Sequence, residues 1–332
     1  MNAGVMVISL DFEIHWGVSD RRSIESYREN LESVPAVVLR LLDIFRENKI
    51  HCTWATVGML FCKSKKELFS YVEESKRPTY ERSYVSNYGV AETTGENESD
   101  DPFHFAPTLI RKIITTPGQE MASHTFSHYY CLEPGQTVEQ FGADLMAAKQ
   151  VAAAENIEVA SIVFPANQFH PDYLQQCRQH GIKCYRGNYP SWIYQFQAKK
   201  KEGLFKRLSR LIDTYLPLMG VRTVSAKMEN GILNIPASCF LRPYSTKLFF
   251  LEWLRVWRIK YEMTKAAKRK KIYHLWWHPH NFGSNIGQNF KTLNAILDHY
   301  KSLEKKYGMK SQTMHEIYND FIQTENPDKL KS

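Results

Sequence analysis

The feature that most constrains the fold is an alternation of short apolar runs with segments whose apolar residues recur at helical spacing. Residues 5–10 form the first apolar run, residues 34–45 follow a helical period, and an apolar run resumes at 52–57. The same patterns predict further strands at 120–123, 160–164, 182–185 and 272–276, and helices at 138–154, 171–180 and 246–269. This alternation is typical of βαβ units, so we predict an α/β fold built on a parallel sheet or barrel.

The length of 332 residues fits one barrel-sized domain or two average ones, and we predict a single domain over 1–332. Residues 76–103 are polar and become acidic towards their end, which predicts a surface insertion. A second insertion, basic and amphipathic, is expected at 195–245. Apolar residues make up 43% of the chain, which excludes a disordered protein and allows a sizeable core.

Cysteine usage and the N-terminus bear on the compartment. The six cysteines include no C-x-x-C pair, which favours reduced, buried thiols over a disulfide framework. The first residues lack the basic and apolar regions of a signal peptide, and no apolar run reaches the roughly 18 residues of a membrane span. We therefore expect a cytoplasmic protein, and a peripheral position at the inner face of the membrane stays open.

Positive charge is concentrated in one segment. Residues 195–271 hold 18 Lys and Arg against 5 Asp and Glu, a surplus of +13, whereas the whole chain carries +8. Residues 204–216 place apolar side chains at helical spacing, with Lys206, Arg207 and Arg210 on the other face. This basic amphipathic helix would either pack on the core or contact an anionic membrane. A single-stranded nucleic-acid groove also combines basic and aromatic residues, but the amphipathic period argues against it, and we expect no nucleic acid.

Residues with catalytic potential follow two of the predicted strands. Asp11 and Glu13 share a face if the first strand stays extended, so that one carboxylate could hold a cation while the other acts as a base. His124 and His128 lie four residues apart, a spacing that lets both bind one metal ion. Taken alone, the carboxylates are more often a solvated turn and the histidines a structural pair. The serines and threonine around the histidines, however, offer the polar partners that metal ligands need.

A third group of chemically capable residues follows the last predicted strand. There the apolar run ends in the sequence His278-Pro279-His280. A histidine at this position, either His278 or His280 in the same turn, could serve as a general acid. Without the other two motifs, a packed aromatic corner would be the better interpretation.

In this order the motifs resemble those of the polysaccharide deacetylase family, the NodB-homology esterases that include carbohydrate esterase family 4. Residues 118–128, GQEMASHTFSH, resemble the family's metal-binding His-x-x-x-His motif. Residues 53–58, TWATVG, resemble its second strand, LDFE at 10–13 stands where the family has an Asp-Asp pair, and WHP at 277–279 is similar to its late histidine motif. The resemblance covers most of the chain. It implies a distorted (β/α) barrel with surface insertions, a divalent metal that is usually zinc, and hydrolytic removal of an N-acetyl group from an amino sugar.

Carried over residue by residue, the resemblance implies that Asp11 is the catalytic base and His278 the general acid. Glu13, His124 and His128 would be the metal ligands, with Glu13 one residue away from the place of the family's second Asp.

Two features of the family are missing from this sequence. The segment FPANQ at 164–168 lacks the Arg that orients the base, and YRGN at 185–188 stands where the family has an Asp-containing motif. The resemblance implies that Arg186 or Asn167 takes over, and both are candidates for substrate binding.

Three tryptophans, Trp16, Trp192 and Trp277, are candidates for stacking on sugar rings, although core packing is the ordinary role of each. The expected substrate is an N-acetylated amino sugar of a polysaccharide or of a lipid-linked glycan precursor. A deformylase or a cyclic-amide hydrolase with the same metal site is one alternative. A catalytically impaired glycan-binding relative is the other, because two family features are missing.

Overall fold

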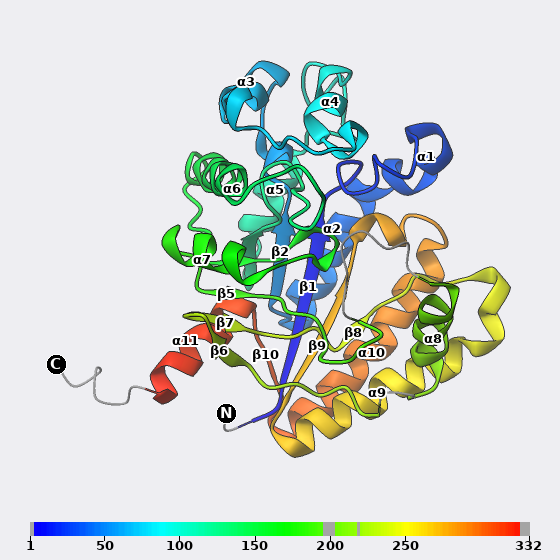
Figure 1. The fold of residues 1–332 in the computed structure, drawn as a ribbon. Coiled ribbons are helices and arrows are strands. Elements are labelled where there is room, and N and C mark those ends of the chain that lie inside the picture. Colours follow the sequence, from blue (N-terminus) through cyan, green and yellow to red (C-terminus); the bar gives the residue numbers. More distant parts are fainter. Residues whose placement is uncertain (1–2, 195–202, 218–219, 326–332) are drawn as a thin grey trace.

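The computed structural model describes residues 3–194, 203–217 and 220–325. At its centre is a curled sheet in the order β6-β7-β5-β4-β3-β2-β1-β9-β8, with β10 paired to the start of β1 (Figure 1). The strands are β1 (Val5–Phe12), β2 (Cys52–Thr56), β3 (Gln119–Ser123), β4 (Ser161–Ile162), β5 (Cys184–Tyr185), β6 (Lys227–Glu229), β7 (Ile232–Asn234), β8 (Cys239–Phe240), β9 (Ile272–Trp277) and β10 (Lys310–Ser311). Among these strands only β6 and β7 pair in antiparallel fashion, and the sheet forms a half-barrel.

Helices pack around this sheet. They are α1 (Ile24–Glu32), α2 (Val34–Asn48), α3 (Lys65–Ser70), α4 (Asn87–Glu92), α5 (Pro107–Ile114), α6 (Val138–Ala153), α7 (Pro171–Gln179), α8 (Leu204–Tyr215), α9 (Glu252–Arg269), α10 (Ile286–Tyr307) and α11 (Met314–Glu325), together with short 3-10 turns. Every residue of β1 and β2 is buried. Helix α9 packs against β9 and α10, so a large core lies between sheet and helices.

The predicted α/β fold with a distorted barrel is confirmed, and each predicted strand and helix has a counterpart. The segment 246–269 divides into a 3-10 turn, η5 (Thr246–Leu251), and α9. Of the range 195–245 predicted as a basic insertion, residues 195–202 and 218–219 lie outside the described residues, and residues 227–240 contain β6, β7 and β8. These strands have only two or three residues each, too few to show a periodic pattern.

The polar segment 76–103 adds no strand to the sheet; it contains the turn η3 (Ser83–Val85) and helix α4. Its end approaches the site described below. All six cysteines are buried and none forms a disulfide, as predicted. Among the described residues, no helix combines the length and the hydrophobicity of a membrane-spanning helix.

Candidate active site with a metal-ligand cluster

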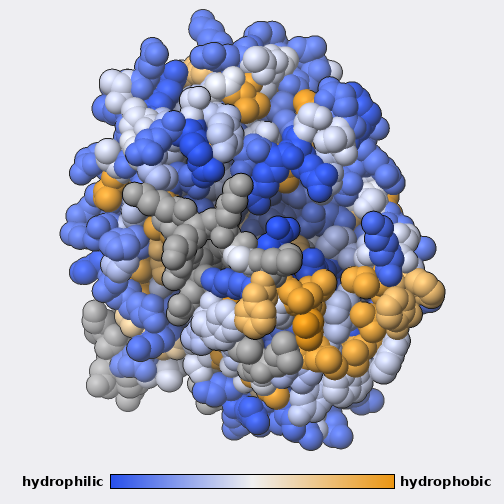
Figure 2. Space-filling view, turned by 45° about the vertical axis from the view of Figure 1, so that its right-hand side comes forward, coloured by the Kyte–Doolittle hydropathy of each residue, from blue (hydrophilic) through white to orange (hydrophobic). Residues whose placement is uncertain are grey.

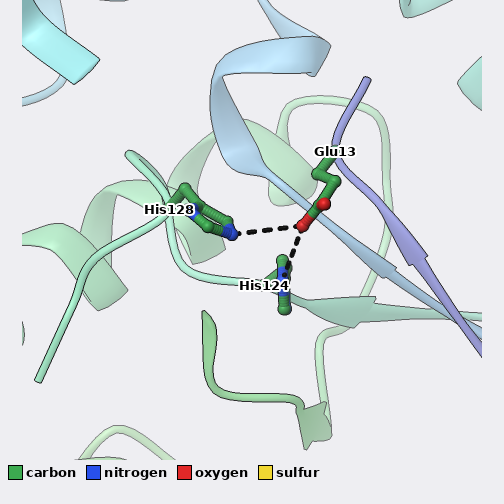
Figure 3. A group of neighbouring side chains, drawn as sticks. All are labelled: Glu13, His124 and His128. Atoms are coloured by element: carbon green, nitrogen blue, oxygen red, sulfur yellow. Dashed lines mark ion pairs between the residues drawn. The ribbon is translucent and has the colours of Figure 1, made fainter. Parts of the chain in front are cut away.

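Glu13, His124 and His128 converge in one buried cluster (Figure 3). Glu13 directly follows β1 and His124 directly follows β3, and the carboxyl ends of parallel strands meet at one edge of a sheet. The Oε2 atom of Glu13 lies 3.2 Å from Nε2 of His124 and 3.1 Å from Nε2 of His128. One potential ligand atom from each residue lies within 4.8 Å of the others. The three residues predicted as metal ligands are therefore brought together.

The hydrogen bonding of this cluster fits a bound cation. Nδ1 of His124 donates to the backbone oxygen of Val163 at 2.8 Å, which leaves Nε2 with a lone pair. That lone pair faces a carboxylate oxygen of Glu13, an arrangement that is repulsive unless a positive charge lies between the two atoms. Burial lowers the pKa of His128, so this imidazole is neutral at neutral pH, as a metal ligand must be. Two histidines and a carboxylate form a donor set that zinc accepts.

The charges around Glu13 keep it ionised. Burial alone would raise the pKa of Glu13, but the neighbouring histidines, His278 first, hold it well below its usual value. Gly17 lies directly against this carboxylate, and a Cβ atom at that position would be 1.9 Å from the Glu13 carboxyl carbon. Any side chain at position 17 would therefore displace the Glu13 carboxylate from its place in the cluster.

The loop between the two histidines is held by residues that the sequence analysis missed. Asp144 on α6 accepts hydrogen bonds from the backbone nitrogens of Phe126 at 2.7 Å and Ser127 at 3.1 Å. Asn87 on α4 donates to the backbone oxygen of Ser127 at 3.0 Å. His128 itself adopts a positive φ of 57°, which this bonded loop maintains. Asp144 and Asn87 are isolated polar residues of helices, and no sequence motif marks them.

Asp11, the predicted base, forms a buried bidentate ion pair with Arg186. The two guanidinium nitrogens lie 2.7 and 2.8 Å from the two carboxylate oxygens. Asn167 accepts a further hydrogen bond from Arg186 at 3.0 Å, and the guanidinium stacks over the Trp276 ring. Burial would raise the pKa of Asp11, but the charge of Arg186 outweighs it and keeps this pKa below its usual value. Arg186 thus holds the Asp11 carboxylate in place, and Asn167 in turn holds Arg186.

Arg186→Gln is expected to destabilise the protein by about 3–5 kcal/mol at neutral pH, because it leaves a buried carboxylate without its partner. In the wild type, the lowered pKa of Asp11 contributes stability that is lost as the pH falls through that pKa. In the variant, burial raises the pKa of Asp11, so protonation at low pH relieves the unpaired charge.

The stability difference between wild type and variant should therefore shrink towards about pH 4. Denaturant unfolding at neutral and acidic pH measures it, with Arg178→Gln on the exposed side of α7 as the control. A difference that does not change with pH would show that Arg186 does not act through the Asp11 carboxylate.

His278, the predicted general acid, faces both carboxylates. Its Nε2 atom lies 3.7 Å from Asp11 and 3.5 Å from Glu13. Tyr27 donates its hydroxyl proton to Oδ1 of Asn281, and Nδ2 of Asn281 donates to Nδ1 of His278 at 3.0 Å. Because Nδ1 accepts this bond, the imidazole proton resides on Nε2, the atom that points into the site.

His280, the alternative acid, lies behind His278 with its ring stacked on that of His278. It is buried, and burial lowers its pKa to about 3. A histidine with such a pKa carries no transferable extra proton at neutral pH, so the geometry favours His278 as the acid.

The predicted stacking roles of Trp16 and Trp277 are wrong. Both rings are at most 1% exposed; Trp16 donates to the backbone oxygen of His104, and Trp277 stacks on Phe282 in the core. Strand β9 alternates its faces, so the neighbour of Trp277, Trp276, points towards the site instead.

A cavity of about 250 Å³ is lined by residues that contact Arg186 and His278. Asn167, Trp276 and Phe240 form part of its wall, and the Phe240 ring contacts both Trp276 and His278. The wall is completed by Asn188, Tyr189, Tyr194, Arg210, Thr214, Arg222, Ala237, Ser238, Cys239 and Arg242. Trp192 is not part of this wall; it is half exposed and stacks on Phe205 of α8.

Comparison with known proteins bears on the fold. No family model matches the sequence, and no curated protein matches it. The structure is similar to that of a putative polysaccharide deacetylase from Mycobacterium smegmatis, with a TM-score of 0.60 and 12% identity, covering 98% of this chain and 92% of that one. A probable polysaccharide deacetylase from Pseudomonas aeruginosa PAO1 gives a TM-score of 0.59 and 11% identity, covering 97% and 92%.

A third similar structure, Puue allantoinase, gives a TM-score of 0.57 and 12% identity, covering 95% of this chain and 89% of that one. The three likenesses extend over nearly the whole chain, although fewer than one residue in eight is identical to its counterpart. The chain therefore has the fold of the NodB-type polysaccharide deacetylases.

Proposed function

We propose that the protein is a metal-dependent hydrolase that removes an N-acetyl group from an amino sugar. The observation that carries this proposal is the convergence of three groups at one edge of the sheet. These are the Glu13, His124 and His128 cluster, an ionised Asp11 held by Arg186, and His278 with its Nε2 proton directed at them. The deacetylase fold supports the same chemistry.

Glu13, His124 and His128 would hold a divalent cation, zinc by the nature of the donor set. When bound, such a cation supplies Lewis acidity towards a water molecule and an amide carbonyl. Asp11 would take the proton of the attacking water, and Arg186 keeps that carboxylate ionised and in place.

The departing nitrogen must be protonated, because an amide anion is too poor a leaving group. His278 would donate this proton from Nε2 as an imidazolium, with the Asn281 amide turned so that its Oδ1 accepts from Nδ1–H of the ring. The sugar ring would lie in the adjoining cavity against Trp276 and Phe240, whose apolar faces suit the C–H face of a pyranose.

Metal analysis of the purified full-length protein, combined with acetate release, tests the proposal. Candidate substrates are lipid-linked and nucleotide-linked N-acetyl amino sugars, assayed beside an N-formyl amino sugar and a cyclic amide. Acetate release that a chelator abolishes and zinc restores would support the proposal. Formate release alone, or opening of the cyclic amide alone, would assign a different amide hydrolase. Glycan binding without any release would identify a binding protein.

A further inference from the structure

Helix α8 exposes an apolar side to solvent. Phe205, Leu208, Ile212 and Leu216 recur along it at three- and four-residue spacing, and between 38% and 72% of each side chain is exposed. The sequence pattern left open whether the apolar residues pack on the core. In the structure Tyr215 packs inward, whereas these four residues do not.

Helix α9 and the preceding turn η5 continue this exposed apolar surface. Trp253, Trp257 and Tyr261 recur every four residues on the outer side of α9, and Phe249 and Phe250 precede them. We call the exposed large hydrophobic residues of η5, α8 and α9, together with Trp192, the aromatic face. Its members are Trp192, Phe205, Leu208, Ile212, Leu216, Phe249, Phe250, Trp253, Trp257 and Tyr261.

Three charged residues of these helices, Asp213, Arg258 and Glu262, are directed inward. Asp213 of α8 pairs with Arg222 and with Arg258 of α9, each at 3.3 Å. Glu262 of α9 pairs with Arg258 at 3.2 Å and with Arg222 at 3.4 Å. All four side chains are at most 3% exposed. This buried network joins α8 to α9 and orients α9 so that its aromatic side points outward.

The aromatic face is the main apolar surface of the described chain. Of the 14 large hydrophobic residues that the described part of the chain exposes, ten belong to it. Figure 2 shows hydrophobic residues gathered in one patch beside a polar hollow. Soluble proteins rarely expose apolar patches of more than a few hundred Å², so a surface of this kind indicates a binding partner.

The surrounding charge indicates what this partner is. Residues 203–271 contain 15 Lys and Arg against 4 Asp and Glu, and two of those acids are buried in the network. Arg207 and Lys247 are exposed beside the aromatic residues. Tryptophan and phenylalanine flanked by lysine and arginine are the composition of helices that lie in the headgroup region of anionic membranes.

We propose that the aromatic face docks on an anionic membrane surface and that the substrate is presented there on a lipid carrier. The second part rests on the proposed function. Arg210 and Thr214 of α8 line the cavity that reaches Trp276 and Asn167, so the helix that meets the lipid also forms one wall of the substrate cavity. Arg210 and Arg242 both line this cavity, and their guanidinium groups suit the phosphate that would join the sugar to a membrane lipid.

Co-sedimentation of the full-length protein with vesicles tests the docking. We expect binding to phosphatidylcholine vesicles that contain phosphatidylglycerol, little binding to pure phosphatidylcholine, and loss of binding with added salt. Phe249→Ser/Trp253→Ser should weaken binding by about tenfold or more. The matched control, Tyr84→Ser/Met146→Ser, removes two other exposed large hydrophobic residues from outside the aromatic face and should bind like wild type.

The electrostatic part is tested by Arg207→Gln/Lys247→Gln, which should weaken binding by roughly fivefold for each charge removed. Lys301→Gln/Lys305→Gln on the exposed side of α10 is the control with the same charge change. Equal binding of all four variants, or equal binding to neutral and anionic vesicles, would overturn the proposal. Self-association that disappears in Phe249→Ser/Trp253→Ser would assign the face to a second copy of the chain.

Turnover separates the two proposals. If both hold, Phe249→Ser/Trp253→Ser should lose acetate release from a lipid-linked sugar in vesicles and retain it on a short water-soluble analogue. Vesicle binding without any acetate release from either substrate would overturn the proposed function and leave the docking intact. An equal loss of acetate release on both substrates would overturn the proposal that the substrate is carried on a lipid.

Discussion

The variant His124→Ala/His128→Ala is expected to lose both its divalent metal and its hydrolase activity. The cluster offers three ligands, and a single buried carboxylate does not retain zinc against bulk water. Metal content of the dialysed protein should fall from about one ion per chain to near zero. The fold should persist, because both histidines lie in the loop after β3 rather than in the hydrophobic core.

His180→Ala/His315→Ala is the matched control, since it removes two partly exposed histidines away from the cluster. This control should keep the metal and the circular-dichroism spectrum of the wild type. Undiminished metal in His124→Ala/His128→Ala would show that the cluster is not the metal site.

Single variants distinguish the carboxylate that binds the metal from the carboxylate that acts as the base. Glu13→Gln should weaken metal binding more than Asp11→Asn, because both oxygens of Asp11 are already bonded to Arg186. Gly17→Ala should also lower the metal content, because its methyl group would displace the Glu13 carboxylate. Gly89→Ala, where a methyl group meets nothing within 4 Å, is the control. If Asp11→Asn weakened metal binding more than Glu13→Gln, Asp11 would be the metal ligand and Glu13 the base.

The four-residue spacing of His124 and His128 predicted that both could bind one metal ion, and the resemblance added Glu13 as the third ligand. Two histidines four residues apart and a carboxylate at a strand end need only the strand geometry to meet. The pairing of Asp11 with Arg186 spans 175 residues of sequence, and no spacing rule could derive it. Arg186 became a candidate only through the resemblance, and its side chain reaches Asp11 from the position directly after β5.

The tryptophans were misassigned because adjacent residues of a strand face opposite sides. Trp276 and Trp277 are both aromatic and both follow an apolar run, so composition does not show which one faces the cavity. Trp16 was misassigned for another reason. His104, which directly follows the segment predicted as a surface insertion at 76–103, covers the Trp16 ring and accepts its hydrogen bond.

The aromatic face shows a further limit of pattern analysis. A helical period reports that apolar residues share a side of a helix but not whether that side is buried. In α9 the buried side carries Arg255, Arg258 and Glu262, which the buried network accommodates. Only the tertiary structure could show that the aromatic side of α9 is the exposed one.

His278→Ala is expected to lower kcat by about 10²–10⁴-fold, the usual contribution of general acid catalysis, with metal content unchanged. The imidazole lies 3.5–3.7 Å from the two carboxylates with its Nε2 proton directed at them, so its loss removes the proton donor to the leaving nitrogen. Added imidazole should restore part of the rate. An amide with a more acidic leaving amine should also suffer less, because its departure needs less protonation.

Two neighbours decide whether His278 is the acid. His280→Ala should reduce kcat much less, because burial lowers the pKa of His280 to about 3 and leaves it neutral at neutral pH. Asn281→Ala should give an intermediate loss with unchanged KM, because Asn281 holds the tautomer of His278 but does not touch the reacting atoms. A large loss of kcat in His280→Ala together with a nearly wild-type kcat in His278→Ala would show that His280 is the general acid. The hydrogen bond from Asn281 to Nδ1 would then serve only to hold the turn after β9 in shape.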